Sequence, residues 1–425
     1  MLWQRQHSGL APKFKSPPLD GPEIVEHITE EAGITSPKGD SLRLDLLVAE
    51  GDSVPQGGAV AQLRDEPGVQ LVSPMPARVA HIRLLPGRKL SEIVLFREPE
   101  GDRLRHQVKF DAANSDSEIR RLVQKAGLWP MFERRPFGGM PKAEERPAAI
   151  VVMTIDTRPL AVDPRHALDE RNDAFVRGLS ALTSFTDGQV FVCHSKGSKP
   201  FEATGSLERV KAVPSGGRHP QGLAGFRIHD LAPASIDQPV WSCHAEDVVA
   251  MGELLETGYL PETRLVGVGG EGLRNSRLVR TQPGADLREL VHRFALPGPH
   301  HLLSGSPLDG VEAHWLGARD RQVTVLPNKR SQRSSHWLLN ALARSSLPPP
   351  VIPTKALTQA FGSALPAAAF TRALASGDEE TAVKLGLLSF LEEDFALADY
   401  VLGGEGHLSE MLNFMLARIE KEYSL

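Results

Sequence analysis

The stretch RLVGVGGEGLRNSRLVRTQPGADLRELV, residues 264–291, decides how this part of the chain folds. An apolar strand pattern at 265–268 leads into a glycine-rich turn, and a second strand pattern and turn precede a short helical pattern at 287–291. Further strand and turn signals follow at 302–306 and 322–326. This order of strands, turns and one short helix predicts a compact α+β module, in which we recognise no catalytic triad or metal cage.

The size and composition of the chain are typical of a multidomain globular protein. Its 425 residues allow about three or four domains, and its net charge of −5 argues against a dedicated nucleic-acid binder. No window approaches the ~20 apolar residues that span a bilayer, and the N-terminus lacks the apolar core of a secretory signal. We therefore expect a cytoplasmic protein that meets a membrane only by docking on a membrane partner.

Cysteine usage limits the redox chemistry of the chain. Only Cys193 and Cys243 are present. Two residues exclude a disulfide framework, and they exclude a cysteine-ligated iron–sulfur cluster, which needs about four thiolates. We interpret both as small buried residues rather than reactive thiols.

Residues 1–110 show short strand patterns separated by turns. The order EGDSVPQG (50–57), a turn at 65–68 and VSP (72–74) resembles biotinyl and lipoyl carrier domains. That resemblance implies a flattened barrel-sandwich of short strands. Carriers hold a lysine at the hairpin tip, because an exposed amine must be acylated, whereas this tip reads DEPG. We therefore predict a structural, partner-docking sandwich and no swinging arm.

Residues 111–256 have the pattern of a Rossmann-like α/β domain. Apolar runs at 149–153 and 189–193 are typical of buried parallel strands, with helical patterns at 117–126, 170–182 and 245–255. No G-x-G-x-x-G follows the first strand, so backbone amides cannot approach a pyrophosphate closely. The sequence therefore predicts no dinucleotide site in this domain.

Three features that suggest ligands have simpler interpretations. The string GVGGEG (267–272) is followed by RNS instead of an apolar helix, so we interpret it as a turn. A zinc site at His219 and His229 would need two further nearby ligands, and none has suitable spacing. We interpret that pair as structural, and His300-His301 as part of a solvated loop.

The last part of the chain, residues 331–425, is predicted to be a linker and a small helical domain. Residues 346–353 are proline-rich and typical of a stiff extended linker. Helical periodicity follows at 355–376, 378–390 and 408–422. The acidic run at 392–394 is interpreted as a solvated helix N-terminus, favoured by the helix dipole. A contact to a basic partner is the alternative.

Several strings, in this order, carry a family resemblance: GLWPMFERRPF (127–137), HPQGLAGFRIH (219–229), SGSPLDG (304–310), LGARDRQVTVL (316–326) and LEEDFAL (391–397). With RNSRLVRT they resemble the A subunit of the sodium-translocating NADH:quinone reductase (Nqr) family, which is distantly related to the flavin-bearing subunit of complex I and to the C subunit of the Rnf complex. The resemblance implies that residues 257–330 form a β-grasp, SLBB-like domain between the α/β domain and the C-terminal helices.

The resemblance also implies a function. The chain would be a peripheral, cofactor-free subunit of a complex that transfers electrons from NADH to ubiquinone and exports Na⁺. NADH, flavins and iron centres would belong to the membrane and NADH-oxidising subunits, on which this chain would dock at the cytoplasmic side of the bacterial inner membrane. We expect no catalytic or metal-binding residue here, and an apolar quinone or partner contact with one or two donors at Trp129, Phe137, Met140, Arg277 and Arg280. The alternative for the loop is a proline-braced surface segment in which Trp129 and Phe137 are packing anchors.

One departure from the family pattern leaves alternatives open. Many members carry a C-x₃-C-P string directly after the acidic run, whereas this chain has Ala398, Leu402 and Gly403, which cannot ligate iron. A stand-alone ligand-binding or scaffold protein built from the same modules is one alternative, and the presence of neighbouring partner genes would argue against it. An NADH dehydrogenase in its own right is another, which would carry bound flavin or NADH.

Overall fold

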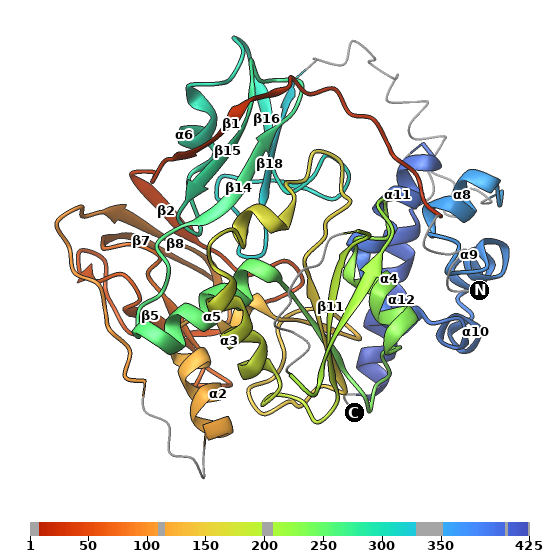
Figure 1. Cartoon of the computed structure of the whole chain (residues 1–425), viewed down its shortest axis with the longest axis horizontal. Helices are drawn as coiled ribbons and strands as arrows, with labels where there is room; N and C mark the ends of the chain where they lie inside the picture. The colour runs from red at the N-terminus through yellow and green to blue at the C-terminus, as the bar shows by residue number, and fades with distance from the viewer. Residues whose placement is uncertain (1–7, 109–114, 198–206, 329–351, 404–406, 424–425) are drawn as a thin grey trace.

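The computed structural model describes residues 8–108, 115–197, 207–328, 352–403 and 407–423 (Figure 1). The described residues form four β-sheets, followed by C-terminal helices. Figure 1 shows the N-terminal strands and the six-stranded sheet on one side of the molecule and the C-terminal helices on the other. This confirms the predicted mixed α+β class with a helical C-terminal part.

Two antiparallel sheets form the N-terminal module, with strand orders β2-β8-β7-β4 and β3-β5-β6. Leu44, Val60 and Ile93 have no exposed surface and belong to its core. The turn at 65–68 joins β5 to β6, as expected. The strands are β2 (Glu31–Ile34), β3 (Leu44–Leu46), β4 (Ser53–Val54), β5 (Ala59–Leu63), β6 (Gln70–Val72), β7 (Ala77–Leu85) and β8 (Lys89–Arg97).

A five-stranded sheet of order β12-β11-β10-β13-β9 forms the α/β module, with only β9 antiparallel to its neighbour. All residues of β10 are buried, which explains its continuous apolar sequence. The predicted strands and helices of this region are confirmed. They are α2 (Ser115–Lys125), β9 (Glu133–Arg135), β10 (Ala149–Met153), α3 (Asn172–Leu182), β11 (Gln189–Ser195), β12 (Val210–Ser215), α4 (Ala224–Leu231), β13 (Val240–His244) and α5 (Ala245–Thr257), with 3₁₀ turns at Trp129–Met131 and Pro164–Ala167.

The third module is a six-stranded mixed sheet of order β1-β15-β14-β18-β16-β17. The predicted strands at 265–268 and 322–326 and the helix at 287–291 are confirmed. The elements are β14 (Arg264–Gly269), β15 (Ser276–Thr281), α6 (Leu287–His292), β16 (His300–Ser304), β17 (Val311–Glu312) and β18 (Gln322–Pro327). His300 and His301 lie in β16 because their backbone pairs with β18, so the expectation of a loop at these histidines was wrong.

The first strand of the chain joins this distant sheet. β1 (Leu19–Glu26) pairs in parallel with β15, and Figure 1 shows the two side by side. The segment before it crosses toward the helices, where Leu10 pairs with His219 and the ring of Phe14 lies 5.4 Å from that of Tyr400. The predicted domain boundary at residue 110 therefore assigns β1 to the N-terminal module, although β1 pairs with a strand of the third module.

The C-terminal helices enclose a core rich in phenylalanine: Phe226, Phe361, Phe370, Phe390 and Phe395. Two predicted helices are each broken at a glycine with positive φ, Gly362 (57°) and Gly386 (103°). The helices are α8 (Lys355–Ala360), α9 (Ala367–Ser376), α10 (Glu379–Lys384), α11 (Glu392–Val401) and α12 (Leu408–Tyr423), with a 3₁₀ turn at Leu387–Ser389. The predicted linker lies mostly outside the described residues.

Candidate functional site: a charged cleft and an adjoining apolar pocket

A cleft of about 180 Å³ lies at the carboxyl ends of β10 and β13, between the α/β sheet, the third module and α11. From β10 the sheet extends to β11 and β12 on one side and to β13 and β9 on the other, so this is its topological switch point. Open α/β sheets bind ligands at such points. We name it the charged cleft, after the charged residues that line it: Lys38, Glu133, Arg135, Asp156, Arg158, Asp247, Asp309, Arg319, Asp320, Arg321, Glu393 and Asp394.

Arg135 is a deeply buried cation of this cleft, with 1% of its side chain exposed. Its Nη1 lies 3.1 Å from Glu133 Oε2 and donates to Ser242 Oγ at 2.9 Å. Its Nη2 lies 3.2 Å from Glu393 Oε1 and 3.6 Å from Asp394 Oδ2. One guanidinium therefore joins β9 of the α/β module to the first turn of α11. We name these four charged groups the Arg135 cluster.

This arrangement corrects the interpretation of the acidic run at 392–394. Glu393 and Asp394 are 14% and 0% exposed, so they do not form a solvated helix N-terminus. They are buried because the first turn of α11 lies against Arg135, and Asp394 Oδ2 also accepts a hydrogen bond from Leu391 N at 2.9 Å. Only Glu392 stays near solvent, where its Oε1 lies 3.7 Å from Lys38 Nζ.

The carboxylates of the Arg135 cluster titrate differently because three of them share one cation. Burial opposes the ionisation of Glu133, but Arg135 and Arg319 outweigh it and lower the pKa of Glu133. Burial, together with the charges of Glu133 and Asp394, raises the pKa of Glu393 to about 8. Glu393 therefore holds a proton at neutral pH. A shifted carboxyl in a cleft is a group able to exchange a proton with a ligand.

A second, partly buried pair joins the α/β module to the third module. Arg158 Nε donates to Asp309 Oδ2 at 2.6 Å, and its Nη1 lies 3.1 Å from Asp156 Oδ2. Burial opposes the ionisation of Asp309, but Arg158 and the Ser306 hydroxyl lower its pKa to about 2. Arg158 and Asp309 are therefore both charged across the neutral range and hold the β16–β17 connection against the end of β10.

The N-terminus of α5, where a sheet of this kind would place a phosphate, is blocked by acidic side chains. Glu246 and Asp247 occupy its first turn, and both pair with Arg321. These carboxylates, already paired with arginines, occupy the helix end that a pyrophosphate would need, and the loop after β10 offers Asp156 and Thr157 instead of glycines. The residues present thus do not fit a dinucleotide.

An apolar pocket of about 160 Å³ adjoins the charged cleft, with Met131, Asp247 and Arg321 lining both. It lies where the N-terminal, α/β and third modules meet. Arg264 Nη1 donates to the carbonyl oxygen of Ala318 at 2.6 Å, and burial and the nearby Arg321 lower the pKa of Arg264 to about 10. The apolar lining consists of Ile34, Pro37, Leu71, Val72, Pro74, Ala126, Leu128, Pro130, Met131, Ala250, Leu260, Pro261, Pro283, Leu316 and Ala318.

The predicted contact residues of the 127–141 loop lie elsewhere. Trp129 is fully buried, donates from Nε1 to the carbonyl oxygen of Pro141 at 2.8 Å and packs edge-on against Trp241. Phe137 is half-buried beside the C-terminal helices, and Met140 is half-buried against the main core. Their role at a quinone or partner contact stays a prediction.

The two predicted arginine donors lie on β15. The guanidinium carbon of Arg277 lies 4.4 Å from the ring centroid of Phe294. Arg280 Nη1 lies 3.9 Å from Glu246 Oε1, which places Arg280 near the N-terminus of α5. Neither residue lines the charged cleft or the apolar pocket. The structure does not bring the five predicted residues into one site.

Sequence reasoning missed the residues that meet in the two cavities. Arg319 and Arg321 lie in the string at 316–326, and Glu393 lies in the string at 391–397. The family resemblance therefore pointed to these segments, but it assigned no function to these three residues. The acidic run at 392–394 was the available signal, but the sequence does not show that Arg135 faces it. The predictions that Cys193 and Cys243 are buried are confirmed, and burial raises the pKa of both thiols.

Comparison with known proteins identifies the family. Residues 114–260 match the model of the NqrA second alpha/beta domain. The A subunit of the Na(+)-translocating NADH-quinone reductase of Teredinibacter turnerae is 33% identical over 89% of this chain and 90% of its own length. The chain belongs to this NqrA family. The Photorhabdus laumondii and Glaesserella parasuis proteins of the same name are 32% and 30% identical, over 90% and 95% of this chain and 91% and 98% of theirs.

Solved structures add little to this family assignment. An NAD⁺-reducing [NiFe]-hydrogenase in its H₂-reduced state aligns with a TM-score of 0.40 and 12% identity, over 72% of this chain and 63% of that chain. A likeness at that level supports no inference. Within the described ranges, the helices of this NqrA family member include none with the length and apolar character needed to cross a membrane.

Proposed function

We propose that this chain acts as the peripheral A subunit of a Na⁺-translocating NADH:ubiquinone reductase and contributes by docking and ligand positioning. The observation that carries the proposal is identity of 30–33% to named NqrA proteins over about nine-tenths of both chains. The chain would lie at the cytoplasmic face of the bacterial inner membrane, against the membrane and NADH-oxidising subunits, which would hold the flavins and iron centres.

The chemistry of the charged cleft supports the assignment of the flavins and iron centres to the partner subunits. The N-terminal turn of α5 is occupied by Glu246 and Asp247 in their ion pairs with Arg321, which leaves no free helix end for the phosphates of NADH or a flavin nucleotide. Two buried cysteines cannot supply an iron–sulfur cluster. We therefore assign electron carriers to the partner subunits. Residues 1–110 and 257–330 serve as docking modules in this proposal, with the barrel-sandwich and β-grasp folds that the family resemblance implies.

The apolar pocket is the place where this chain would receive a quinone headgroup. Ligand sites of that kind are mostly apolar with a few polar groups that fix orientation. Arg264 supplies a guanidinium at the wall of the pocket, where its N–H groups can donate to a quinone carbonyl. Phe137 and Met140, both half-buried, remain proposed partner contacts.

The test is made on the assembled complex, purified through a tag on this chain. Ala250 lies on α5 in the apolar pocket, so Ala250→Leu narrows the pocket, and Arg264→Met removes the donor. Both should raise KM for a short-chain ubiquinone about tenfold or more while NADH oxidation with an artificial acceptor is unchanged. Ala368→Leu, on the exposed side of α9, is the matched control. Unchanged KM in both variants would remove the quinone assignment, and a chain that purifies alone would overturn its assignment to the complex in favour of a scaffold protein.

A further inference from the structure

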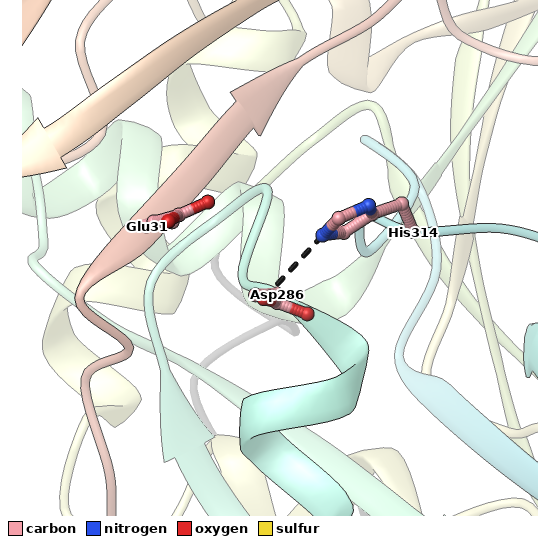
Figure 2. Close-up of side chains that lie close together, drawn as sticks. All are labelled: Glu31, Asp286 and His314. Carbon is pink, nitrogen blue, oxygen red and sulfur yellow. Dashed lines mark ion pairs between the residues drawn. The ribbon is translucent and has the colours of Figure 1, made fainter. Parts of the chain in front are cut away.

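Three side chains converge at the junction between the N-terminal module and the third module. Glu31, Asp286 and His314 each offer one ligand atom, and the three atoms lie within 4.8 Å of one another. They come from β2, from the residue that caps α6 and from the connection between β17 and β18, as Figure 2 shows. We propose that this trio binds one divalent transition cation of the Zn²⁺ type.

The distances suit such an ion. Bonds of about 2.0–2.2 Å to nitrogen and oxygen at tetrahedral angles place neighbouring ligand atoms about 3.4 Å apart. His314 Nε2 lies 3.4 Å from Asp286 Oδ2, so two ligands already have that spacing. Glu31 lies no more than 4.8 Å from either, and a side-chain rotation closes the difference. The fourth position would be open to water.

The charges around the trio favour a cation. Within the described residues, no lysine or arginine side chain forms an ion pair with Glu31 or Asp286. Two carboxylates so close together repel each other, and a divalent ion would offset that repulsion. Imidazole with carboxylate oxygens is a donor set typical of Zn²⁺.

The protein already holds two of the three ligands in place. Asp286 Oδ1 accepts a hydrogen bond from Arg288 N at 2.7 Å, which leaves Oδ2 directed at the imidazole. The His314 ring stacks on Trp315, with centroids 4.1 Å apart and an interplanar angle of 20°. Trp315 is fixed in turn, because its Nε1 donates to Glu92 Oε2 at 3.0 Å. The His314 side chain is 43% exposed, so an ion can enter from solvent.

A bound ion would tie the first module to the third. Glu31 belongs to a strand of the four-stranded sheet, whereas Asp286 and His314 belong to the six-stranded sheet module. Backbone bridges between Ala32 and Ala285 and between Asp286 and Trp315 already hold the segments that carry the three ligands beside one another. The ion would therefore stabilise the relative placement of two of the three modules that border the apolar pocket.

The experiment is a Co²⁺ titration of the full chain after chelator treatment, followed by visible absorbance. The expected result is one tetrahedral Co²⁺ per chain, displaced by Zn²⁺. Glu31→Gln and His314→Gln should weaken binding at least ~100-fold, because each removes a direct ligand. His301→Gln is the matched control, since His301 has the same 43% exposure but pairs with a single carboxylate, Glu312.

A second readout guards against misfolding of a variant. Zn²⁺ should raise the Tm of the wild-type chain and of His301→Gln, and leave Glu31→Gln and His314→Gln unchanged, while all four share similar metal-free Tm values. Absence of Co²⁺ binding to the wild-type chain would overturn the proposal. Equal binding by the wild-type chain and both ligand variants would also overturn it, because the ion would then sit elsewhere.

Discussion

Replacing Arg135 by methionine tests how strongly the Arg135 cluster holds α11 against the α/β module. The side chain is 1% exposed and faces Glu133, Glu393 and Asp394. Removing one partner of a buried ion pair leaves uncompensated charge and costs about 3–5 kcal/mol. Glu393 already holds a proton at neutral pH, so the loss of Arg135 acts mainly on Glu133, whose pKa Arg135 lowers, and on Asp394, which lies 3.6 Å from Arg135. We expect Arg135→Met to lower the free energy of unfolding by an amount within that range.

The matched control is Arg177→Met. Arg177 Nη1 lies 2.8 Å from Glu256 Oε2, but the two side chains are 33% and 56% exposed. A solvated pair of this kind contributes about 1 kcal/mol or less. Comparing two arginine-to-methionine changes removes differences in side-chain volume and isolates the effect of burial.

The assay is urea unfolding followed by tryptophan fluorescence. Trp129 and Trp241 are fully buried near β9, so their emission reports on this part of the molecule. The loss of unfolding free energy in Arg135→Met should shrink from pH 7.5 to 5.5, because the buried carboxylates that lose their cation in the variant can take up protons. A loss of unfolding free energy in Arg135→Met below about 1 kcal/mol, or one equal to the loss in Arg177→Met, would refute the reasoning.

Three further predictions concern single residues. Glu393→Gln should flatten the pH dependence of stability. The pKa of the Glu393 carboxyl is about 8 in the folded protein against 4.5 in the unfolded chain, so the folded protein keeps a proton that the unfolded chain loses. The wild-type stability present below pH 4.5 is therefore lost as the pH rises to 8, by up to roughly 1.4 kcal/mol per pH unit. Gly252→Ala should lower Tm, although alanine favours helices, because a Cβ would lie 1.8 Å from the Ala174 carbonyl oxygen. Gln282→Met should lower the free energy of unfolding in urea by about 1–3 kcal/mol. The Gln282 side chain accepts a hydrogen bond from Thr29 N at Oε1 and donates one from Nε2 to the Thr29 carbonyl oxygen, both at 3.1 Å.

Each of these has a result that contradicts it. An unchanged pH profile for Glu393→Gln would mean that this carboxyl is ionised in the folded protein. A raised Tm for Gly252→Ala would mean that α3 and α5 can separate without loss. Wild-type stability for Gln282→Met would mean that the joint between the N-terminal and third modules does not depend on that amide.

The parts of the fold that follow local patterning could be predicted from the sequence. The run at 149–153 is apolar throughout because both faces of β10 are covered, and α5 ends at Gly258 with a left-handed conformation. Strand partners could not be predicted in the same way. β1 pairs with β15 across most of the chain, and nothing in residues 19–26 encodes that choice locally.

The candidate site was harder to predict because its parts are dispersed. Arg135, Arg158, Asp309 and Glu393 become neighbours only after three modules assemble. An acidic helix start is usually solvated, and only the facing Arg135 makes this one an interior feature. The aromatic Trp129 attracted attention as a contact, yet the same size and apolar character place it in the core.

The central claim is that this chain works by contact and carries no electron carrier of its own. The most direct measurement is purification from membranes through a tag on this chain, with absorbance spectra of the complex and of the chain separated from it. The account predicts that the partner subunits co-purify and that the separated chain is colourless and does not oxidise NADH. A chain that purifies alone with bound flavin, or that oxidises NADH unaided, would contradict it.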